Sequence, residues 1–264
     1  MRLSGPEGRL ASRVLAAAGL PRDPDIRRIT LGKSGDLVVR SGPAFLKIAG
    51  AGTGARQRLR QEADALAWLS GRVQVPALLW SGEVSGRMAL VTSALPGRPL
   101  SDVAPQEAEA ALAEGARALA ALHALSLEGC PGDGSVEALL AEGRRAAAEG
   151  RVDADDFHPD HQGWTPEQLI AAIAADPPPE SAPVPTHGDA CLPNLVWSRE
   201  TGIGFVDVGR LGPGDPWRDF ALFLRSAERN HPGVDAAGLL TRTLPGWRHD
   251  ARRDFGFRRL DELA

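Results

Sequence analysis

Three oxygen-bearing side chains stand at a spacing that suits the transfer of a phosphoryl group. Asp189, in the sequence His-Gly-Asp, is followed after four residues by Asn194, and Asp207 begins the sequence Asp-Val-Gly. Carboxylate and amide oxygens are the ligands that a divalent cation such as Mg²⁺ prefers, and a remaining carboxylate can orient a hydroxyl. The order His-x-Asp-x4-Asn and then Asp-x-Gly is that of a phosphoryl-transfer signature. Asn194 and Asp207 are therefore predicted metal ligands, and Asp189 is the predicted catalytic residue.

The surrounding segments predict a hairpin that brings these residues together. Residues 195–197 and 203–206 are short apolar runs, and residues 198–202 between them have the composition of a turn. The first two candidates precede the first strand and the third follows the second, so all three are expected at the open end of the hairpin. Taken singly, each also fits an ordinary turn or a strand edge. Their common register favours the metal-binding and catalytic interpretation.

This pattern, His-Gly-Asp-x4-Asn followed by Asp-Val-Gly-Arg-Leu-Gly at 207–212, resembles that of the aminoglycoside phosphotransferases. Within that family it is most similar to the 3'-phosphotransferases that act on kanamycin and neomycin. The segments 152–156, 161–164 and 259–263 support the same branch. The resemblance extends from about residue 28 to the end of the chain and is dense after residue 150.

The resemblance implies an α+β, protein-kinase-like fold with a small antiparallel β-sheet lobe and a mainly helical large lobe. It implies transfer of the γ-phosphate of ATP, or GTP, to a hydroxyl of an aminoglycoside antibiotic, expected to be the 3'-OH, and hence antibiotic resistance. The nucleotide would lie between the lobes, with Mg²⁺ neutralising charge on its phosphates. Asp189 would act more by positioning the acceptor hydroxyl than as a strong base. Arg210 would steady the catalytic loop or the transferring phosphate.

Composition excludes several classes of partner. The chain has 30 basic and 34 acidic residues, a net charge of −4 and no long basic run, so nucleic acid is not an expected partner. Cys130 and Cys191 are too few for a disulfide framework and fit a reducing cytoplasm, and Cys191 is interpreted as a packing residue. No stretch approaches the roughly 18 apolar residues that a membrane span needs. We expect a cytoplasmic monomer whose partners are a nucleotide and an aminoglycoside.

The N-terminal part of the chain predicts an antiparallel sheet. After a short helix at 11–18, strands are expected at 28–31, 37–39, 44–48, 77–80 and 88–92. The glycine-containing turn between the first two strands carries Ser34 and would lie over the nucleotide phosphates, with backbone N–H groups available to anionic oxygen. Alone, this turn is equally compatible with a plain hairpin.

Lys47 on the third predicted strand is the candidate lysine for the nucleotide phosphates. Its apolar neighbours point to the opposite face of the strand, so Lys47 faces either solvent or the nucleotide. Residues 56–70 predict a helix with one apolar face, and Glu62 lies beside that face. Asp64 is the alternative partner but lies on the outer side of the helix. The resemblance selects Glu62.

The change from strands to helices places a hinge at residues 92–97. Pro96-Gly97 interrupts the pattern, and the chain beyond it is helical. The backbone from Ser93 to Leu95 would contact the adenine edge, although an ordinary interdomain turn would look the same. The expected lobes are residues 1–95, which bind the nucleotide, and residues 96–264, which carry catalysis and substrate binding.

Beyond the hinge, the sequence predicts helices at 104–126 and 136–150. His123 in the first of these is expected to be a hydrogen-bonded structural histidine. A capping box at Thr165 is expected to start another helix. Asp219 would point inward and support the catalytic loop in this fold.

An acidic stretch at 153–161 contains Asp156 and Asp160. Such a stretch fits a solvated surface, and mixed Asp and His could also bind metal, although the spacing suits no standard zinc site. The resemblance favours a third interpretation, in which carboxylates in a cleft complement the ammonium groups of an aminoglycoside. His158 and Pro159 stand where close relatives carry acidic residues.

The C-terminal residues 255–264 predict a short helix that presents Asp261 and Glu262. Two acids at a tail are commonly solvated, but this ending matches that of the family, whose acids bind substrate amines. Ala264 replaces the aromatic residue with which the family usually ends. Arg225 would line the acceptor site, as its family counterpart does.

Other classes of function fit the sequence less well. A kinase of streptomycin (a 3''-type enzyme), of choline or of a sugar-like metabolite would favour an aromatic cage or another set of C-terminal acids. A protein kinase would carry Ala-Pro-Glu after Asp207, which this sequence lacks. A non-catalytic kinase-like binding module would not need the full set of Lys47, Asp189, Asn194 and Asp207.

Overall fold

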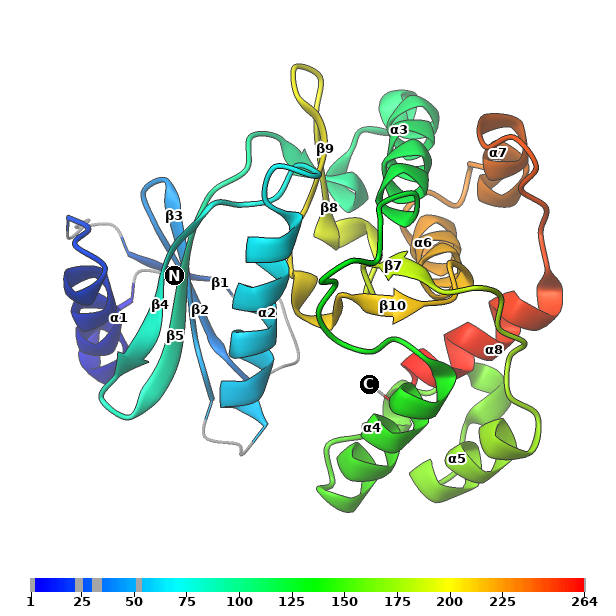
Figure 1. Ribbon diagram of the computed structural model, residues 1–264, viewed down its shortest axis with the longest axis horizontal. Helices are drawn as coiled ribbons and strands as arrows, with labels where there is room; N and C mark the ends of the chain where they lie inside the picture. The colour runs from blue at the N-terminus through cyan, green and yellow to red at the C-terminus, as the bar shows by residue number, and fades with distance from the viewer. Residues whose placement is uncertain (1–2, 22–25, 30–34, 51–53, 264) are drawn as a thin grey trace. The chain divides into compact units, whose positions relative to one another are not determined.

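The computed structural model describes residues 3–21, 26–29, 35–50 and 54–263. Its contacts divide the chain into two compact units, Met1–Pro96 with Gly204–Gly209, and Gly97–Ile203 with Arg210–Ala264 (Figure 1). The segment Gly204–Gly209 therefore groups with the first unit, although it is remote from the rest of that unit in sequence. Among the described residues, no helix is both long and apolar enough to cross a membrane.

The first unit is built on a five-stranded antiparallel sheet with the strand order β1-β2-β3-β5-β4. Its strands are β1 (Arg27–Ile29), β2 (Leu37–Ser41), β3 (Ala44–Ile48), β4 (Leu78–Val84) and β5 (Arg87–Ser93). Each strand overlaps the segment predicted for it, so the predicted five-stranded sheet is confirmed.

Two helices pack on the sheet, α1 (Gly5–Ala17) and α2 (Ala55–Leu69). Successive side chains of a strand point to opposite faces. On β3, Leu46 and Ile48 enter the apolar core that contains the buried face of α1. Lys47 points to the other face, where it meets a side chain of α2. The alternation along one strand therefore separates the core of the unit from its polar face.

The second unit is mainly helical. Its helices are α3 (Pro105–His123), α4 (Val136–Ala148), α5 (Pro166–Ala175), α6 (Trp217–Asn230), α7 (Ala236–Thr243) and α8 (Ala251–Asp261). Short strands accompany them: β6 (Arg98–Pro99), β7 (Val184–Thr186), β8 (Leu195–Ser198) and β10 (Gly212–Gly214). Strand β9 (Gly202–Phe205) begins in this unit, and its last two residues belong to the first. Strand β7 pairs with β10, and β8 lies between β6 and β9, so the predicted β8–β9 hairpin is present.

Helix α6 is the central helix of the second unit. Nearly all of its residues from Trp217 to Ala227 are buried, including the charged pair Arg218 and Asp219. A helix that is buried on all sides lies in the interior of its domain. Because buried charges must be paired or hydrogen-bonded, these two side chains need partners inside the unit.

Two helices have different bounds from those expected. The N-terminal helix begins at Gly5 rather than at residue 11, with a proline in its first turn. The C-terminal helix is α8, Ala251–Asp261, rather than 255–264. The Asp250 carboxylate accepts the backbone N–H groups of Arg252 and Arg253, each at 3.1 Å. This cap starts the helix earlier than the apolar pattern indicated.

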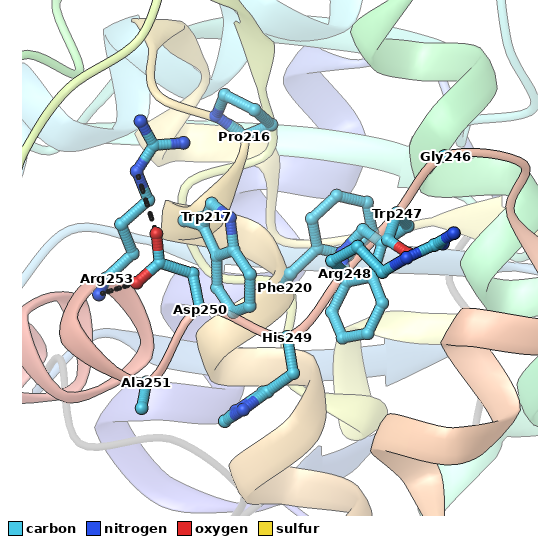
Figure 2. Close-up of a pocket in the computed structure, with 10 residues that line it drawn as sticks. All are labelled: Pro216, Trp217, Phe220, Gly246, Trp247, Arg248, His249, Asp250, Ala251 and Arg253. Carbon is cyan, nitrogen blue, oxygen red and sulfur yellow. Dashed lines mark hydrogen bonds and ion pairs between the residues drawn. The ribbon is translucent and has the colours of Figure 1, made fainter.

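An aromatic pocket of about 630 Å³ lies beside α6 (Figure 2). The rings of Trp217 and Trp247 are stacked with centroids 5.4 Å apart, and His249 packs against both of them. The lining residues include none of those predicted for the site. The pocket is therefore separate from the predicted chemistry.

Candidate active site

In the first unit, Lys47 is held between two carboxylates. Its Nζ lies 2.6 Å from Oε1 of Glu62 on α2 and 2.9 Å from Oδ1 of Asp207. Burial alone would lower the pKa of Lys47, but the charges of Asp207 and Glu62 raise it above its ordinary value. The lysine therefore remains a cation at any physiological pH. The expected ion pair with Glu62 is present, and Asp64 is exposed, as predicted.

Glu62 is a buried carboxylate that depends on this lysine. Its side chain is only 9% exposed. Burial raises the pKa of Glu62, and the charge and hydrogen bond of Lys47 act in the opposite direction. Asp207 adopts a positive φ of 56°, which is uncommon for a residue other than glycine, and its side chain remains 56% exposed. Backbone strain of this kind clusters at functional sites.

In the second unit, Asp219 fixes the predicted catalytic loop. Its carboxylate accepts the backbone N–H groups of His187 and Gly188, each at 2.8 Å. His123 Nε2 lies 2.8 Å from the same carboxylate. Burial alone would raise the pKa of Asp219, but the hydrogen bond and charge of His123, the charge of His187 and the Gly188 N–H lower it overall. The predicted structural roles of Asp219 and His123 are confirmed.

The loop is further fixed from within. Asn194 ends the 3-10 turn η4 (Leu192–Asn194), and its Nδ2 donates to the carbonyl oxygen of Asp189 at 2.9 Å. The Asp189 N–H donates to Nδ1 of His187 at 3.2 Å. These contacts use the backbone of Asp189 rather than its carboxylate. The backbone of Asp189 is thus fixed, and its carboxylate lies beside the thiol of Cys191.

Gly188 lies where no other residue fits. Its φ is +85°, and a Cβ atom there would come within 2.2 Å of the carbonyl oxygen of Arg210. The guanidinium of Arg218 lies just beyond and donates to Oγ1 of Thr186 at 3.2 Å. Burial lowers the pKa of Arg218. Arg218 could not be recognised from the sequence, because a single arginine on a helix carries no local signal of burial.

Cys191 lies in the same loop, and its own thiol is inert. Burial and the nearby Asp189 carboxylate raise its pKa above the ordinary value. A thiol in that state does not act as a nucleophile. This agrees with its interpretation as a packing residue.

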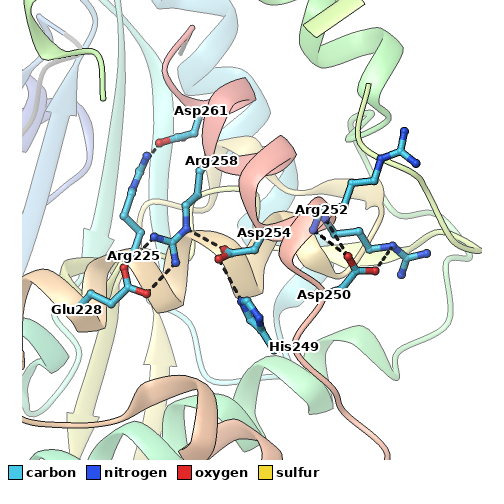
Figure 3. A network of polar contacts seen from close by, with 9 residues as sticks. Arg225, Glu228, His249, Asp250, Arg252, Asp254, Arg258 and Asp261 are labelled. Carbon is cyan, nitrogen blue, oxygen red and sulfur yellow. Dashed lines mark hydrogen bonds and ion pairs between the residues drawn. The ribbon is translucent and has the colours of Figure 1, made fainter. Parts of the chain in front are cut away.

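Asp261, at the end of α8, is paired with two arginines. Its carboxylate contacts the guanidinium of Arg225 on α6 (Figure 3) and lies 3.5 Å from Nη1 of Arg210. Burial alone would lower the pKa of Arg225, but Asp261 raises it. Three of the predicted site residues therefore lie together, already paired with one another.

Glu262 is engaged by the acidic stretch. Nδ1 of His161 lies 3.0 and 3.1 Å from its two carboxylate oxygens, and the His158 N–H donates to Oε2 at 3.0 Å. His161 was not predicted as a site residue. The signal in the sequence is its place in the segment 161–164, which also carries the family resemblance.

The other predicted residues are dispersed. Asp156 and Asp160 are exposed, on the 3-10 turns η2 (Ala154–Asp156) and η3 (Pro159–His161). Ser93 uses its N–H and its Oγ to bond Ala77, each at 2.9 Å, and Leu95 follows it without regular structure. Ser34 lies outside the described residues. Within the described ranges, no group of three or more His, Cys, Asp or Glu side chains is arranged to hold a metal ion.

Comparison with known proteins adds a family context to this geometry. The model of the phosphotransferase enzyme family matches residues 25–257. An aminoglycoside 3'-phosphotransferase of Streptomyces fradiae is 39% identical over 176 residues, which make up 64% of this chain and 65% of that protein. The chain thus matches just under two thirds of the length of that relative.

Solved structures match over nearly the whole chain. The crystal structure of an aminoglycoside 3'-phosphotransferase of type VIII is 30% identical, with a TM-score of 0.81, over 97% of this chain and 99% of that one. The aminoglycoside phosphotransferase APH(3'')-Id from Streptomyces rimosus, in complex with ADP and streptomycin, is 25% identical. Its TM-score is also 0.81, over 96% of this chain and 98% of that one.

Proposed function

This chain belongs to the phosphotransferase enzyme family, and we propose that it transfers the γ-phosphate of ATP or GTP to the 3'-hydroxyl of an aminoglycoside antibiotic. The predicted family and the protein-kinase-like α+β fold are confirmed by the family model and by the solved structures. The named activity of the Streptomyces fradiae relative supports the choice of substrate. Phosphorylation of the antibiotic would make the enzyme a resistance determinant.

The observation that carries the proposal is the contact of Lys47 with Glu62 at 2.6 Å. In kinases, a lysine on the third strand must be paired with a helical glutamate before it can position the nucleotide phosphates. Here the pair is formed, with Glu62 buried and Lys47 half-buried, and Asp207 is the second anion beside the lysine. A solvated surface lysine would not need two carboxylates, one of them buried. We therefore assign Lys47 and Glu62 to the phosphates of the nucleotide.

The acceptor hydroxyl is assigned to Asp189. Its backbone is fixed by the contacts of Asn194 and of His187, which restricts the positions open to its carboxylate. The hydroxyl oxygen forms a bond to the γ-phosphorus while the bond to the β-phosphate oxygen breaks and the nucleoside diphosphate leaves. Because the transition state is loose, orienting the hydroxyl matters more than removing its proton early. The proton of the acceptor hydroxyl passes to Asp189 or to solvent. Arg210 steadies the loop that carries Asp189.

Asp207 and Asn194 would hold Mg²⁺. Carboxylate and amide oxygens suit this cation. The Nδ2 of Asn194 donates to the carbonyl oxygen of Asp189, so its Oδ1 is the atom that would be offered to the cation. Enzymes that transfer phosphate commonly bind Mg²⁺ through one or two carboxylates together with the phosphates of the substrate. When bound, the ion neutralises negative charge on those phosphates.

The remaining assignments concern the nucleotide and the substrate. Ser34 is assigned to the phosphates. Leu95 and Ser93 are assigned to the adenine, and Ser93 would contact it through a group other than its N–H, which is bonded to Ala77. Substrate ammonium groups are assigned to Asp156, Asp160, Asp261 and Glu262, with Arg225 lining that site. We assign the nucleotide to lobe 1–95 and catalysis to lobe 96–264. Free Cys130 and Cys191 support a cytoplasmic protein, and we propose a monomer.

A coupled assay of nucleotide turnover with Mg-ATP tests the proposal. The acceptors are kanamycin, its 3'-deoxy counterpart tobramycin, streptomycin and choline, with Asp189→Ala as the control. Turnover with kanamycin but not with tobramycin, lost in Asp189→Ala, is the expected result. Kanamycin turnover that survives in Asp189→Ala would contradict the assignment of that residue. Equal turnover with both antibiotics would exclude the 3'-hydroxyl.

A second candidate function is a streptomycin 3''-kinase. The observation that favours it is the likeness to the Streptomyces rimosus protein, which was solved with ADP and streptomycin. Turnover with streptomycin alone would select this function. It would keep the roles of Lys47 and Asp189 and replace the assigned substrate groups.

A further inference from the structure

Ser226 on α6 contacts the loop that carries Asp189 at a point beyond that residue. The backbone N–H of Leu192 donates to Ser226 Oγ at 3.0 Å, and the contact spans 34 residues of sequence. Both residues are buried, with Ser226 8% exposed and Leu192 fully covered. A buried N–H that loses its partner stays unsatisfied, because water does not replace it. The hydroxyl of Ser226 is therefore the group on which this backbone contact depends.

Serine is not the residue that helix packing alone would favour at this position. Its helix propensity is lower than that of alanine or leucine, and a buried hydroxyl is costly unless it is hydrogen-bonded. Asn230, one turn further along α6, donates from Nδ2 to Ser226 Oγ at 3.2 Å and to the carbonyl oxygen of Ser226 at 2.7 Å. Asn230 thus orients the hydroxyl that meets the N–H of Leu192.

Asp219 and Ser226 tie the two ends of the loop to one side of α6. Ser226 follows Asp219 by seven positions, so both project from the same face of the helix, about 10 Å apart along its axis. Asp219 holds backbone N–H groups just before Asp189, and Ser226 holds that of Leu192. From Gly188 to Leu192 an extended chain spans at most about 14 Å. Asp189, which lies between the two anchors, therefore has little freedom while both contacts hold.

Leu192 is also connected to Asp189 through the turn that follows it. It begins the turn η4, which ends at Asn194. Nδ2 of Asn194 donates to the carbonyl oxygen of Asp189 at 2.9 Å. A displacement of Leu192 would move this turn and, through Asn194, the backbone of Asp189.

We propose that Ser226 is a positioning residue that fixes Asp189 for the acceptor hydroxyl by holding the N–H of Leu192. This inference rests on the proposed function and adds a residue that acts through the loop. The rival role is direct contact with the antibiotic, since the neighbouring Arg225 is assigned to line its site. The two roles differ in kinetics: loss of positioning lowers kcat, whereas loss of uniform substrate binding raises KM.

Steady-state kinetics of Ser226→Ala and Ser226→Thr test the proposal. Alanine removes the acceptor oxygen without adding bulk, and threonine keeps an oxygen on Cβ. We expect Ser226→Ala to lower kcat roughly tenfold or more, because a misplacement of about 1 Å can cost about a hundredfold in rate. KM for kanamycin and for ATP should stay within about twofold, and Ser226→Thr should restore most of kcat. If the extra methyl group of threonine disturbs the fold, Ser226→Cys, with a weak acceptor, should give an intermediate kcat.

Ser135→Ala is the matched control. Ser135 Oγ accepts the N–H of Ala138 at 3.3 Å and caps α4, which also belongs to the second unit. The control therefore removes the same kind of contact, a serine hydroxyl with a backbone N–H, but away from the loop. The urea midpoint should fall in both alanine variants, whereas kcat of Ser135→Ala should stay within about twofold of wild type. Equal losses of kcat in the two variants would make Ser226 a general stabilising residue and overturn the inference.

Asn230→Ala tests the same contact from its other side. It keeps the hydroxyl of Ser226 and removes the group that orients it, so kcat should fall less than in Ser226→Ala. The double variant should be no slower than Ser226→Ala, because Asn230 acts through that hydroxyl. Additive effects on kcat would contradict this. A raised KM for kanamycin with unchanged kcat in Ser226→Ala would assign Ser226 to the antibiotic and overturn the inference.

Hydrogen exchange provides a readout that needs no activity. Mass spectrometry on the substrate-free protein should show faster exchange of the peptide covering residues 187–194 in Ser226→Ala, and wild-type exchange in Ser135→Ala. Thermal unfolding of each variant identifies a global loss of fold. If the wild type phosphorylated no aminoglycoside, the proposed function would fail while exchange still decided whether Ser226 holds the loop. Equal exchange of this peptide in Ser226→Ala and wild type would overturn the proposal.

Discussion

The carboxylate of Asp219 accepts the backbone N–H of Gly188 at 2.8 Å, a contact that spans 31 residues of sequence. It joins the central helix α6 to the loop that carries Asp189. Since Asp219 is fully buried, water cannot substitute for a lost partner. The position of the proposed catalytic carboxylate is therefore coupled to the stability of the second unit.

Asp219→Asn is expected to destabilise the protein by about 3 kcal/mol. Asparagine offers one oxygen and an NH₂ group, so at least one donor among His123 Nε2 and the N–H groups of His187 and Gly188 would face another donor. Urea unfolding measures the loss. The control is Asp176→Asn, which removes an exposed pair with Arg252 and should change stability by less than about 0.5 kcal/mol. Equal effects of the two substitutions would contradict the argument.

The stabilisation by Asp219 should depend on pH in a defined direction. The pKa of Asp219 in the folded protein is lowered from its ordinary value of 3.8. A carboxyl group with a lowered pKa stabilises the fold above its unfolded pKa and loses that contribution as the pH falls through its folded pKa. The difference in unfolding free energy between wild type and Asp219→Asn should hold between about pH 7 and pH 5 and shrink below about pH 3.8. A difference that grew in acid would refute this.

Local patterns were sufficient to predict most elements of the fold. The alternation of side chains on β3 separated Lys47 from the core, and the apolar face of α2 placed Glu62 within reach of it. The capping box at Thr165 is formed, with both of its hydrogen bonds to Gln168 present. Such features depend on neighbours in sequence, which is why sequence alone identifies them.

Contacts between distant segments could not be predicted in the same way. Asp261 and Glu262 looked alike in the sequence, yet one pairs with Arg225 and the other with His161. The partner of each acid is set by the packing of α8, and no local pattern encodes it. The roles of these acids toward a substrate stay a prediction.

Gly188→Ala should reduce both stability and activity. The new methyl group would lie 2.2 Å from the carbonyl oxygen of Arg210, so the loop would have to move. The matched control is Gly150→Ala, which has a φ of +65° and no atom within 4 Å of the added Cβ. That control should cost only the strain of the backbone, about 1–2 kcal/mol. Urea unfolding and kcat should show a larger loss at Gly188; losses of equal size would exclude the steric argument.

Lys47→Ala should lower kcat/KM for ATP more than it lowers kcat/KM for the antibiotic. Loss of a hydrogen bond to a charged phosphate corresponds to a roughly ten- to 150-fold lower kcat/KM for ATP. Arg60→Ala, at an exposed residue of α2, serves as the control and should leave kcat/KM unchanged. Kinetics at saturating kanamycin measure both variants. A Lys47→Ala enzyme with normal kcat/KM for ATP would remove the main support for the assignment.

Glu62→Gln should lower stability in the wild type but not in a Lys47→Ala background. In the wild type it leaves Lys47 with only Asp207 as a partner and should lower stability by roughly 1–3 kcal/mol, because a buried charge pair loses one member. In Lys47→Ala the glutamate has lost the cation that opposed the effect of burial. Glu62→Gln then no longer breaks a pair with Lys47, and stability should change little. A double-mutant cycle by urea unfolding measures this coupling, and equal losses in both backgrounds would show that Lys47 and Glu62 are not energetically linked.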